Sequence, residues 1–428
     1  MSRSYTGAVT LSPTAITVAE TTGPPPGGDS LGERFAAVLF DDAEPFDLYR
    51  EARQSSPVFW SDTAGSWVVT RHADVRTVFE DGERFKPLAF GPGSSMIHGR
   101  VILHMEGREH SFHAGILGRW IRSRRRMEGD LRALAERIAD RIVVSLPTGE
   151  PVDLHEVLNT EMPMEMTATF MGIPQVAAFR HWYDAIGKAS VSNIRNDPDV
   201  ERRGRQARAE LGEWLGSVID AKRVEPGEDL LSDLCVARFD GAPLSDETIA
   251  SACSLLLAAG TETTSRALSN LQKALLVNDL WERLRAEPDL VVPACAESLR
   301  YNAPAHGLVR QAAIDTQLGG VNLAAGAKLF ALVGSANRDP EVFPDPDRFI
   351  IDRFKEDAFR QFTPKADILP FGAGAHHCTG SLLARLEMEV VMCCLLERFE
   401  RVEFAGEVPD DTGYVLRGPR HVRVVLGG

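Results

Sequence analysis

Apolar and polar residues along most of this chain repeat with the period of an amphipathic helix. The repeat covers four stretches, residues 72–79, 109–144, 154–171 and 200–221. Two further stretches, residues 57–60 and 66–70, alternate as strands do, and residues 62–65 between them have the composition of a hairpin turn. The pattern therefore predicts a fold that is mainly α with a small β portion.

The second half of the chain continues this combination of helices and short strands. We expect one helix to end near Tyr301 and a long helix to end near Arg398. Further strands are predicted around residues 317–318, 321, 328–333, 402–404 and 422–426. Residues 85–104 are rich in Gly, Pro and Ser, which predicts a long irregular segment, and such segments in compact domains tend to be functional.

One helix is predicted to cross the middle of the domain. Ser245 has the position of an N-cap residue, and Thr248 begins the helical run. From residue 249 the run is apolar on nearly all faces through Leu257, and it continues to Leu271. Because a helix that is apolar all round has no face suited to water, the rest of the protein must surround it.

Composition and charge limit the class of protein. With 44% hydrophobic and 25% charged residues, the 428-residue chain can bury a large core. A formal charge of −14 argues against nucleic acid or an anionic membrane surface as general partners. Residues 1–18 lack the features of a signal peptide, and we find no apolar run of about 18 residues. The run GPPPGG at residues 23–28 breaks regular structure, so we expect residues 1–30 to form a flexible segment.

Cysteine usage indicates a reducing compartment. The six cysteines form neither a CxxC pair nor a zinc-binding pattern with histidine, and several lie in apolar helical stretches. They are Cys235, Cys253, Cys295, Cys378, Cys393 and Cys394. This usage suits a cytoplasmic protein with free thiols better than a secreted protein with a disulfide framework.

Cys378 differs from the other cysteines because it lies in the glycine-rich stretch FGAGAHHCTG, residues 371–380, just before an apolar helical run. Glycines let the backbone approach closely and adopt conformations that a Cβ forbids. The first N–H groups of the following helix point back toward the sulfur, which favours a thiolate that binds a flat metal cofactor. The simpler alternative is a free cysteine that acts as a small buried hydrophobe.

Polar groups interrupt the predicted central helix at residues 259–264, AGTETT. Gly260 removes a side chain where a flat ligand could lie against the helix. Glu262 supplies an acid and Thr263 a hydroxyl, and together these groups could pass protons to a bound dioxygen. The alternative is a helix kink in which the threonine hydroxyls bond to carbonyls of the preceding turn.

Glu297 and Arg300 stand three positions apart, so a helix places both on one face. If this face is on the surface, the ion pair contributes only a few tenths of a kcal/mol. If it is buried, a bidentate network around the pair would hold a neighbouring loop rigid. In either case the expected role is structural.

These segments resemble motifs of the soluble bacterial cytochromes P450. Residues 371–380 match the haem-ligand loop Phe-x-x-Gly-x-His/Arg-x-Cys-x-Gly, residues 259–263 match the oxygen-activation signature Ala/Gly-Gly-x-Asp/Glu-Thr, and residues 297–300 match Glu-x-x-Arg. The resemblance spans about residues 35–426, with the motifs in the family's order. It implies one cytochrome P450 domain over residues 31–428, with haem b between the central (I) helix and the cysteine-ligand (L) helix.

The resemblance also implies roles for individual residues. Cys378 would be the axial ligand of the haem iron, with Glu262 and Thr263 as a proton relay. Haem contacts are implied for Gly260 and Phe371, and propionate contacts for His110, Arg310 and His376. Arg348 in FPDPDRF, residues 343–349, would be the third member of the network of Glu297 and Arg300.

One position departs from the family pattern. The family's helix that begins His-Thr/Ser-x-x-Arg carries an arginine four residues after the histidine, and this chain has Ala114 there. The resemblance therefore leaves three alternatives open. Either His113 or Arg108 supplies the missing propionate contact, or one propionate is held more loosely.

The implied activity is that of a monooxygenase. It would oxidise a small organic substrate, such as a specialised metabolite, with O2 and with electrons from a separate ferredoxin and ferredoxin reductase. The basic run from Arg122 to Arg126 would lie on the cysteine side of the haem and attract an acidic ferredoxin. Substrate contacts are expected from apolar residues in the pocket-lining segments, although each suits an ordinary core as well. These candidates are Met96, Ile97, Leu256, Ala259, Ala305 and Leu308.

Three alternative functions remain at this point. The same fold could catalyse coupling, desaturation or peroxide-driven oxidation, although the intact Glu262 and Thr263 argue against a peroxide specialist. A non-enzymatic haem-thiolate sensor is a second alternative, and the sequence shows no attached output domain to favour it. The third is a cofactor-free helical protein in which the motifs occur by chance.

Overall fold

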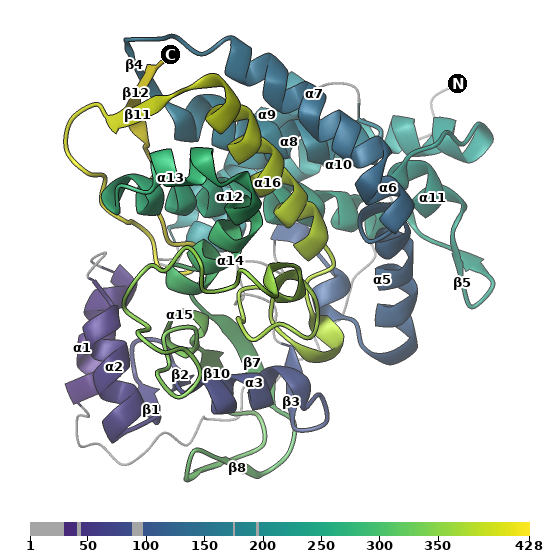
Figure 1. Ribbon diagram of the computed structural model, residues 1–428. Helices are drawn as coiled ribbons and strands as arrows, with labels where there is room; N and C mark the ends of the chain where they lie inside the picture. The colour runs from purple at the N-terminus through teal and green to yellow at the C-terminus, as the bar shows by residue number, and fades with distance from the viewer. Residues whose placement is uncertain (1–29, 41–43, 88–96, 174–175, 194–196) are drawn as a thin grey trace.

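The computed structural model describes residues 30–40, 44–87, 97–173, 176–193 and 197–428. The expected flexible segment therefore lies outside the described residues except for its last position, Ser30, where the first helix begins. Helices predominate over strands throughout the described ranges, as Figure 1 shows. The prediction of a mainly α fold with a small β portion is confirmed.

The helices of the first half surround the centre of the molecule in Figure 1. They are α1 (Ser30–Phe40), α2 (Phe46–Ser55), α3 (His72–Glu80), α5 (Gly107–Ile121), α6 (Arg124–Glu128), α7 (Asp130–Val144), α8 (Glu161–Met171), α9 (Val176–Gly187), α10 (Pro198–Val224) and α11 (Leu230–Val236). The second half adds α12 (Asp246–Val277), α13 (Trp281–Ala286), α14 (Val291–Tyr301), α15 (Val333–Ala336) and α16 (Ser381–Arg398). The helix ends predicted at Tyr301 and near Arg398 are both confirmed.

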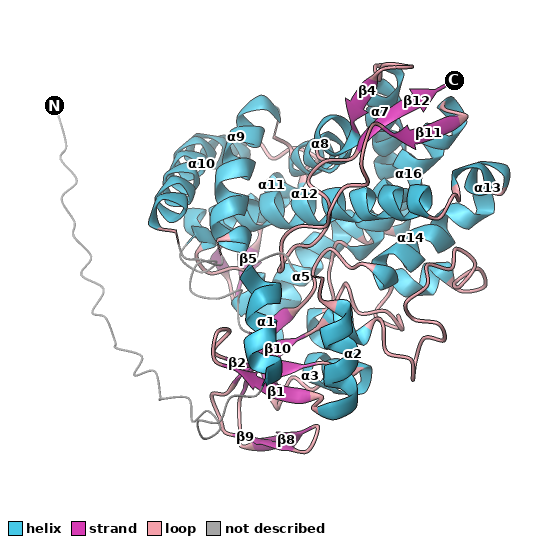
Figure 2. Ribbon diagram, turned by 90° about the vertical axis from the view of Figure 1, so that its left-hand side faces the viewer, coloured by secondary structure: helices cyan, strands magenta, loops and turns pink. Residues whose placement is uncertain are grey.

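The largest sheet has five strands in the order β1-β2-β10-β7-β3 and lies beside α1, α2 and α3 (Figure 2). Its strands are β1 (Val58–Ser61), β2 (Ser66–Val69), β3 (Phe85–Pro87), β7 (Leu308–Ala312) and β10 (Lys328–Ala331). β1 and β2 form the predicted antiparallel hairpin, and β10 runs parallel to β2. The sheet thus joins the start of the chain to the segment that follows α14.

Seven further strands complete the β portion of the described residues. They are β4 (Pro151–Asp153), β5 (Arg238–Phe239), β6 (Ala242–Pro243), β8 (Thr316–Leu318), β9 (Val321–Leu323), β11 (Arg401–Phe404) and β12 (Arg423–Gly427). β11, β12 and β4 form a second sheet, while β5-β6 and β8-β9 are hairpins. The prediction that residues 85–104 are irregular throughout is wrong at its start, because Phe85–Pro87 bonds to β7 as an edge strand.

α12 is the predicted central helix. The Ser245 hydroxyl accepts a hydrogen bond from the N–H of Thr248 at 3.1 Å, so the predicted N-cap is confirmed. α12 packs against α8, α9, α10, α14 and α16 and crosses the helical part of the molecule (Figure 2). Within the described residues, no helix, including this one, is both long and apolar enough to cross a membrane.

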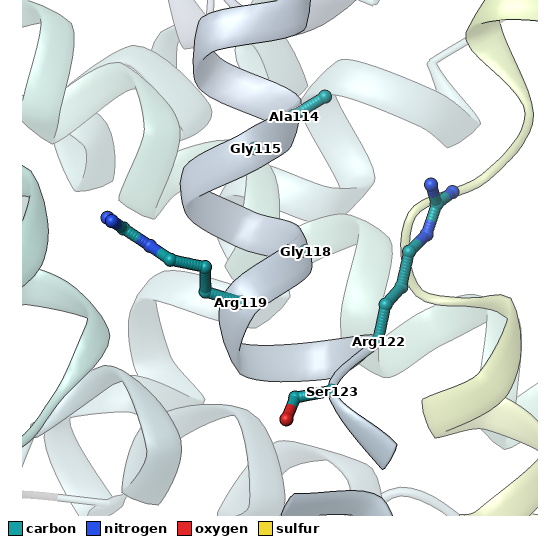
Figure 3. A pocket seen from close by; sticks show the side chains of 6 residues that line it. All are labelled: Ala114, Gly115, Gly118, Arg119, Arg122 and Ser123. Atoms are coloured by element: carbon teal, nitrogen blue, oxygen red, sulfur yellow. The ribbon is translucent and has the colours of Figure 1, made fainter. Parts of the chain in front are cut away.

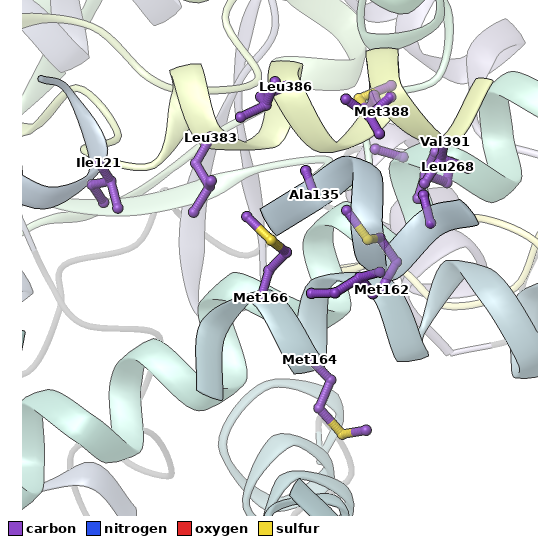
Figure 4. Packing of buried hydrophobic residues seen from close by; sticks show 14 of the residues in the cluster. Ile121, Ala135, Met162, Met164, Met166, Leu268, Leu383, Leu386, Met388 and Val391 are labelled. Carbon is purple, nitrogen blue, oxygen red and sulfur yellow. The ribbon is translucent and has the colours of Figure 1, made fainter. Parts of the chain in front are cut away.

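The main hydrophobic core lies among α7, α8, α12, α14 and α16. Met162 and Met166 lie on the side of α8 that faces α7 and α16, with Met166 pointing toward Leu383, whereas Met164 points to the other side of α8 (Figure 4). All three methionines are fully enclosed. Because methionine is flexible and unbranched, it fills the irregular gaps between helices that cross at different angles.

A buried ion pair fixes the loops below α14. Glu297 and Arg300 have no exposed side-chain surface, and the guanidinium donates two parallel bonds to the carboxylate, at 2.7 and 2.8 Å. Arg300 also donates to the carbonyls of Asn337 and Pro346. The amide oxygen of Asn337 in turn accepts from the N–H of Leu369, two residues before the cysteine loop begins at Phe371. The network therefore positions that loop from beneath.

The third arginine of this network is not the one predicted. Arg353 donates its Nε–H to the carboxylate of Glu297 at 3.0 Å. Arg348, which the sequence suggested, is exposed and contributes only its carbonyl oxygen, which accepts from Arg300 at 3.0 Å. The chain turns between these positions, and this turn carries the Arg348 side chain outward while Arg353 reaches inward.

Replacing Glu297 by Ala should destabilise the folded protein by roughly 3–5 kcal/mol, because it leaves Arg300 buried without a counter-charge. Arg348→Ala is the matched control and should change the free energy of unfolding by less than about 0.5 kcal/mol. Chemical denaturation followed by circular dichroism measures both values. A stability loss in Arg348→Ala as large as that in Glu297→Ala would contradict the placement of the Arg348 side chain outside this network.

Candidate functional site

The loop before α16 is shaped by glycines. Gly372 and Gly374 have φ values of +67° and +69°, which strain any residue with a Cβ. At Gly374 a Cβ would also lie 2.7 Å from the carbonyl oxygen of Phe79, so this loop packs directly against the end of α3. The N–H of Cys378 donates to the carbonyl of Phe371 at 2.8 Å and closes the loop. The cysteine is thereby held just before the first turn of α16.

The Cys378 side chain is exposed even though protein atoms surround it closely enough to desolvate the sulfur. This desolvation raises the pKa of the thiol. The N–H group of Gly380, the charge of Arg122 and the N–H group of Ser381 act in the opposite direction and lower the pKa of the thiol. The start of α16 therefore presents N–H donors to the sulfur, as the sequence predicted.

Arg122, the residue that follows α5, donates hydrogen bonds to the same loop. Its Nη2 donates to the carbonyls of Cys378 at 2.9 Å and His377 at 3.1 Å, and its Nε donates to the carbonyl of Thr379 at 3.2 Å. The sequence singled out Arg122 only as part of a basic run. Nothing in its spacing from Cys378, 256 positions later, could have indicated this contact.

The polar positions of α12 divide between two faces. Ala259 is exposed on a helix that is otherwise largely enclosed. The Thr263 hydroxyl donates to the carbonyl of Ala259 at 2.8 Å, as in the back-bonded alternative. Gly260 was expected to face a flat ligand, but a Cβ there would lie 2.8 Å from the hydroxyl of Thr167. The prediction for Gly260 is corrected, because its missing side chain lets α8 pack closely on α12.

Glu262 is held by two partners that the sequence did not name. Its carboxylate accepts from the phenol of Tyr183 on α9 and from the Nε–H of Arg266, the latter at 3.1 Å. Burial opposes ionisation, yet the charge of Arg266 and the bond from Tyr183 lower the pKa of Glu262 below its usual value. Ionised Glu262 therefore stabilises the folded protein fully at pH values above the ordinary pKa of Glu. This contribution is lost as the pH falls through the lowered pKa of the folded state.

The three predicted propionate partners lie together. The rings of His110 on α5 and His376 in the cysteine loop are 4.2 Å apart between centroids. Arg310 on β7 is buried against the ring of Phe79, and burial lowers its pKa to about 10. Burial, together with the charges of His110 and Arg310, lowers the pKa of His376 to about 4. Three basic side chains from different parts of the chain thus form one cluster beside the cysteine loop, in which Arg310 carries the charge.

Known proteins share both this sequence and this fold. The family profile for Cytochrome P450 matches residues 219–420. Cytochrome P450 107B1 of Saccharopolyspora erythraea is 32% identical over 89% of this chain and 95% of its own length. Mycinamicin IV hydroxylase/epoxidase of Micromonospora griseorubida is 31% identical over 91% of this chain and 98% of its own length. The crystal structure of CYP109E1 from Bacillus megaterium with testosterone has a TM-score of 0.77 at 27% identity, covering 90% of this chain and 99% of that one.

The chain belongs to the cytochrome P450 family. The P450 fold expected from the sequence is confirmed, and the protein is an oxidoreductase of the P450 monooxygenase type. Cytochromes P450 are haem-thiolate enzymes, in which a cysteine thiolate is the axial ligand of the haem iron. In the sequence, three short motifs at residues 259–263, 297–300 and 371–380 had indicated this family.

Ala114 of this P450 lies on a groove beside the cysteine loop, where the family pattern has arginine. The groove measures about 560 Å³ (Figure 3). It is lined by Ala114, Gly115, Gly118, Arg119, Arg122 and Ser123. Arg108, one expected substitute, points elsewhere and pairs with Asp240 at the β5–β6 hairpin. The other candidate, His113, is buried on α5.

The predicted substrate residues of this P450 differ in exposure. Leu256, Ala305 and Leu308 are half-buried, and Leu308 lies close to the cysteine loop, 3.9 Å from where a Cβ of Gly372 would be. Ile97 is fully enclosed, which suits a core residue. Met96 lies outside the described residues. Among the described candidates, Leu308 lies beside the cysteine loop and Ala259 is exposed on α12.

Tyr183→Phe should raise the pKa of Glu262, because it removes a donor to the ionised carboxylate while the group stays largely buried. Infrared difference spectroscopy across a pH titration measures this shift, with Glu262→Gln identifying the carboxylate band. Tyr301→Phe is the matched control, since Tyr301 is half-buried on α14 and makes no contact with Glu262. An unchanged midpoint in Tyr183→Phe would contradict the geometry described here.

Proposed function

We propose that Cys378 binds haem b as its axial thiolate ligand and that the protein hydroxylates or otherwise oxidises a small organic substrate. The observation that carries this proposal is the placement of Cys378, an exposed residue just before α16 whose thiol lies beside the backbone of Gly380 and Ser381. Backbone N–H donors stabilise a thiolate and tune a metal bound to it.

The residues around the sulfur fit a haem. The loop needs glycine at Gly372 and Gly374, so no side chain from these positions extends over the sulfur. Ala259 gives the central helix a small exposed surface against which a flat group can lie. Phe371, half-buried in the loop, adds an aromatic surface beside the cysteine. When bound to a thiolate, haem supplies the chemistry that activates dioxygen.

The cluster of His110, Arg310 and His376 fits the two carboxylates of such a haem, with one charged guanidinium and two imidazoles that can donate hydrogen bonds. His110, His376 and Arg310 come from α5, the cysteine loop and β7, so together they can hold an acidic edge in one orientation. In the described residues Arg310 pairs with no carboxylate and donates to the carbonyl of Val309 at 2.9 Å. A guanidinium buried without a counter-charge is costly, and an anionic group at this position would remove the cost.

Glu262 and Thr263 have the chemistry of a proton relay, but each is engaged in the present arrangement. Thr263 donates to Ala259, and Glu262 accepts from Tyr183 and Arg266. To move a proton inward, the carboxylate must exchange one of these partners for a donor connected to solvent, and the Thr263 hydroxyl must turn from the helix. We propose that Glu262 supplies protons and that the Thr263 hydroxyl positions the dioxygen that would receive them.

The substrate is proposed to be a small, largely apolar organic molecule. The relatives named above include a hydroxylase/epoxidase of mycinamicin IV and a protein crystallised with testosterone. In this chain Ala259, Leu256, Ala305 and Leu308 offer only apolar surface, which suits orientation by shape. The carbon to be oxidised is then the one that this apolar surface holds above the cysteine loop.

Electrons are proposed to come from a ferredoxin and its reductase. The helix α6 carries Arg124, Arg125 and Arg126 directly after Arg122, which bonds to the cysteine loop, so this basic surface lies on the cysteine side of the fold. Arg124 and Arg126 share their charge with acidic neighbours on α6 and α7. The net protein charge is −14, and this local reversal of sign can steer an acidic donor to one face.

Cys378→Ala should abolish the thiolate-type Soret band of the reduced, carbon monoxide-treated protein. Cys393→Ala, which removes an exposed cysteine elsewhere on α16, is the control and should retain the band. Circular dichroism confirms that both variants fold. Survival of the band in Cys378→Ala, or its absence from the parent protein after reconstitution with haem, would overturn the proposed function.

Reversing Arg124, Arg125 and Arg126 to Glu should slow reduction by an acidic ferredoxin about tenfold or more at low salt, with a smaller effect as salt screens the charges. Stopped-flow absorbance measures the rate. The control reverses three exposed arginines of α10, namely Arg202, Arg203 and Arg205. If both triple variants are reduced at equal rates, the basic surface of α6 has no part in docking.

A further inference from the structure

Arg122 makes three hydrogen bonds to the cysteine loop. Its guanidinium donates to three consecutive carbonyls, those of His377, Cys378 and Thr379, between 2.9 and 3.2 Å. The fork geometry of arginine permits several such bonds from one rigid group, which lysine cannot reproduce. Within the described residues, the hydrogen bonds of the Arg122 side chain all go to carbonyls of residues 377–379, the segment that contains Cys378.

The charge of Arg122 is not neutralised by a carboxylate. In the described part of the chain no Asp or Glu lies within ion-pair distance of it, whereas Arg119 pairs with Asp233 at 3.4 Å and Arg124 with Glu128 at 2.8 Å. Burial lowers the pKa of the Arg122 guanidinium, and the nearby Cys378 sulfur raises it in opposition. Among these arginines of α5 and α6, Arg122 is the one whose charge acts directly on the thiol.

Carbonyl bonds and charge act together at this site. Carbonyl oxygens are the negative ends of peptide dipoles, and three of them beside a thiolate would repel its charge. Arg122 offsets these dipoles from one side, while the N–H groups of Gly380 and Ser381 face the sulfur from the other. A fixed cation near a redox centre favours the state with one more electron, since that state is more negative.

We propose that Arg122 is a positioning residue of the haem-thiolate site, which fixes the backbone of residues 377–379 and makes the bound haem easier to reduce. This inference rests on the proposed axial role of Cys378. It gives the chain a cation at the residue that follows α5, whereas the family pattern would have placed one two helical turns earlier, at Ala114. In Figure 3 Arg122 points toward the cysteine loop, and Arg119 points to the opposite side of α5.

Spectroelectrochemical titration of the haem-loaded protein tests this directly. Arg122→Gln keeps part of the hydrogen bonding and removes the charge, so the ratio of reduced to oxidised haem at a fixed solution potential should fall about threefold to tenfold. A tenfold change corresponds to 59 mV for a one-electron couple. Arg119→Gln, on the same helix and groove, is the matched control and should leave the ratio within about twofold of the parent.

The variant Arg122→Lys separates the effect of the positive charge from the effect of the hydrogen bonds to the loop carbonyls. It keeps the positive charge but loses the three-carbonyl fork, so the reduction ratio should lie between those of the parent and Arg122→Gln. Both Arg122 variants should lose part of the thiolate-type Soret band on reduction with carbon monoxide, because the loop is less firmly held. Arg119→Gln should retain the full band.

The possible results separate this inference from the function on which it rests. If the parent protein lacks the thiolate-type band, or Cys378→Ala keeps it, the proposed function fails. If the parent shows the band but Arg122→Gln leaves the reduction ratio within twofold, or Arg119→Gln lowers it equally, the inference about Arg122 alone fails. A ratio in Arg122→Lys as low as that in Arg122→Gln would also overturn it, because charge would then play no part.

Discussion

A sulfur that must stay accessible to a ligand and still be held in place is the constraint on which this structure depends. The backbone around it has to supply the donors, because side chains would cover the sulfur. Positive φ values at Gly372 and Gly374 bring the chain past α3, and the start of α16 then directs the N–H groups of Gly380 and Ser381 at the sulfur. The residues that contact the loop keep this arrangement of backbone and sulfur fixed.

Two arginines hold the loop from different sides. Arg300, buried with Glu297, acts through Asn337, whose side chain binds the N–H of Leu369 just ahead of the loop. Arg122 acts at the far end, on the carbonyls that flank Cys378. The first network is enclosed and contributes rigidity, because breaking it would leave charges without partners. The second is exposed at one edge, so its charge can also influence the chemistry of the sulfur.

The motif on α12 shows that residues close together in sequence can contact different neighbouring helices. From sequence, Gly260, Glu262 and Thr263 form one ligand-facing group, and the structure divides them. Gly260 faces α8, and Glu262 is bound to α9 through Tyr183. The i,i+4 spacing of Glu262 and Arg266 could have been found in the sequence, because a helix makes these positions neighbours. Tyr183 could not, since it lies 79 positions away on another helix.

The sequence by itself determined the mainly helical fold class, the central position of α12, the hairpin of β1 and β2, and the family, because periodicity, capping and motif spacing are local properties. Only the tertiary structure decided that Arg353 rather than Arg348 joins Glu297, and that Arg122 reaches Cys378. These contacts depend on where turns direct long side chains, which no local pattern specifies. His110, His376 and Arg310 stand between the two cases, because the resemblance named them and folding brought them together.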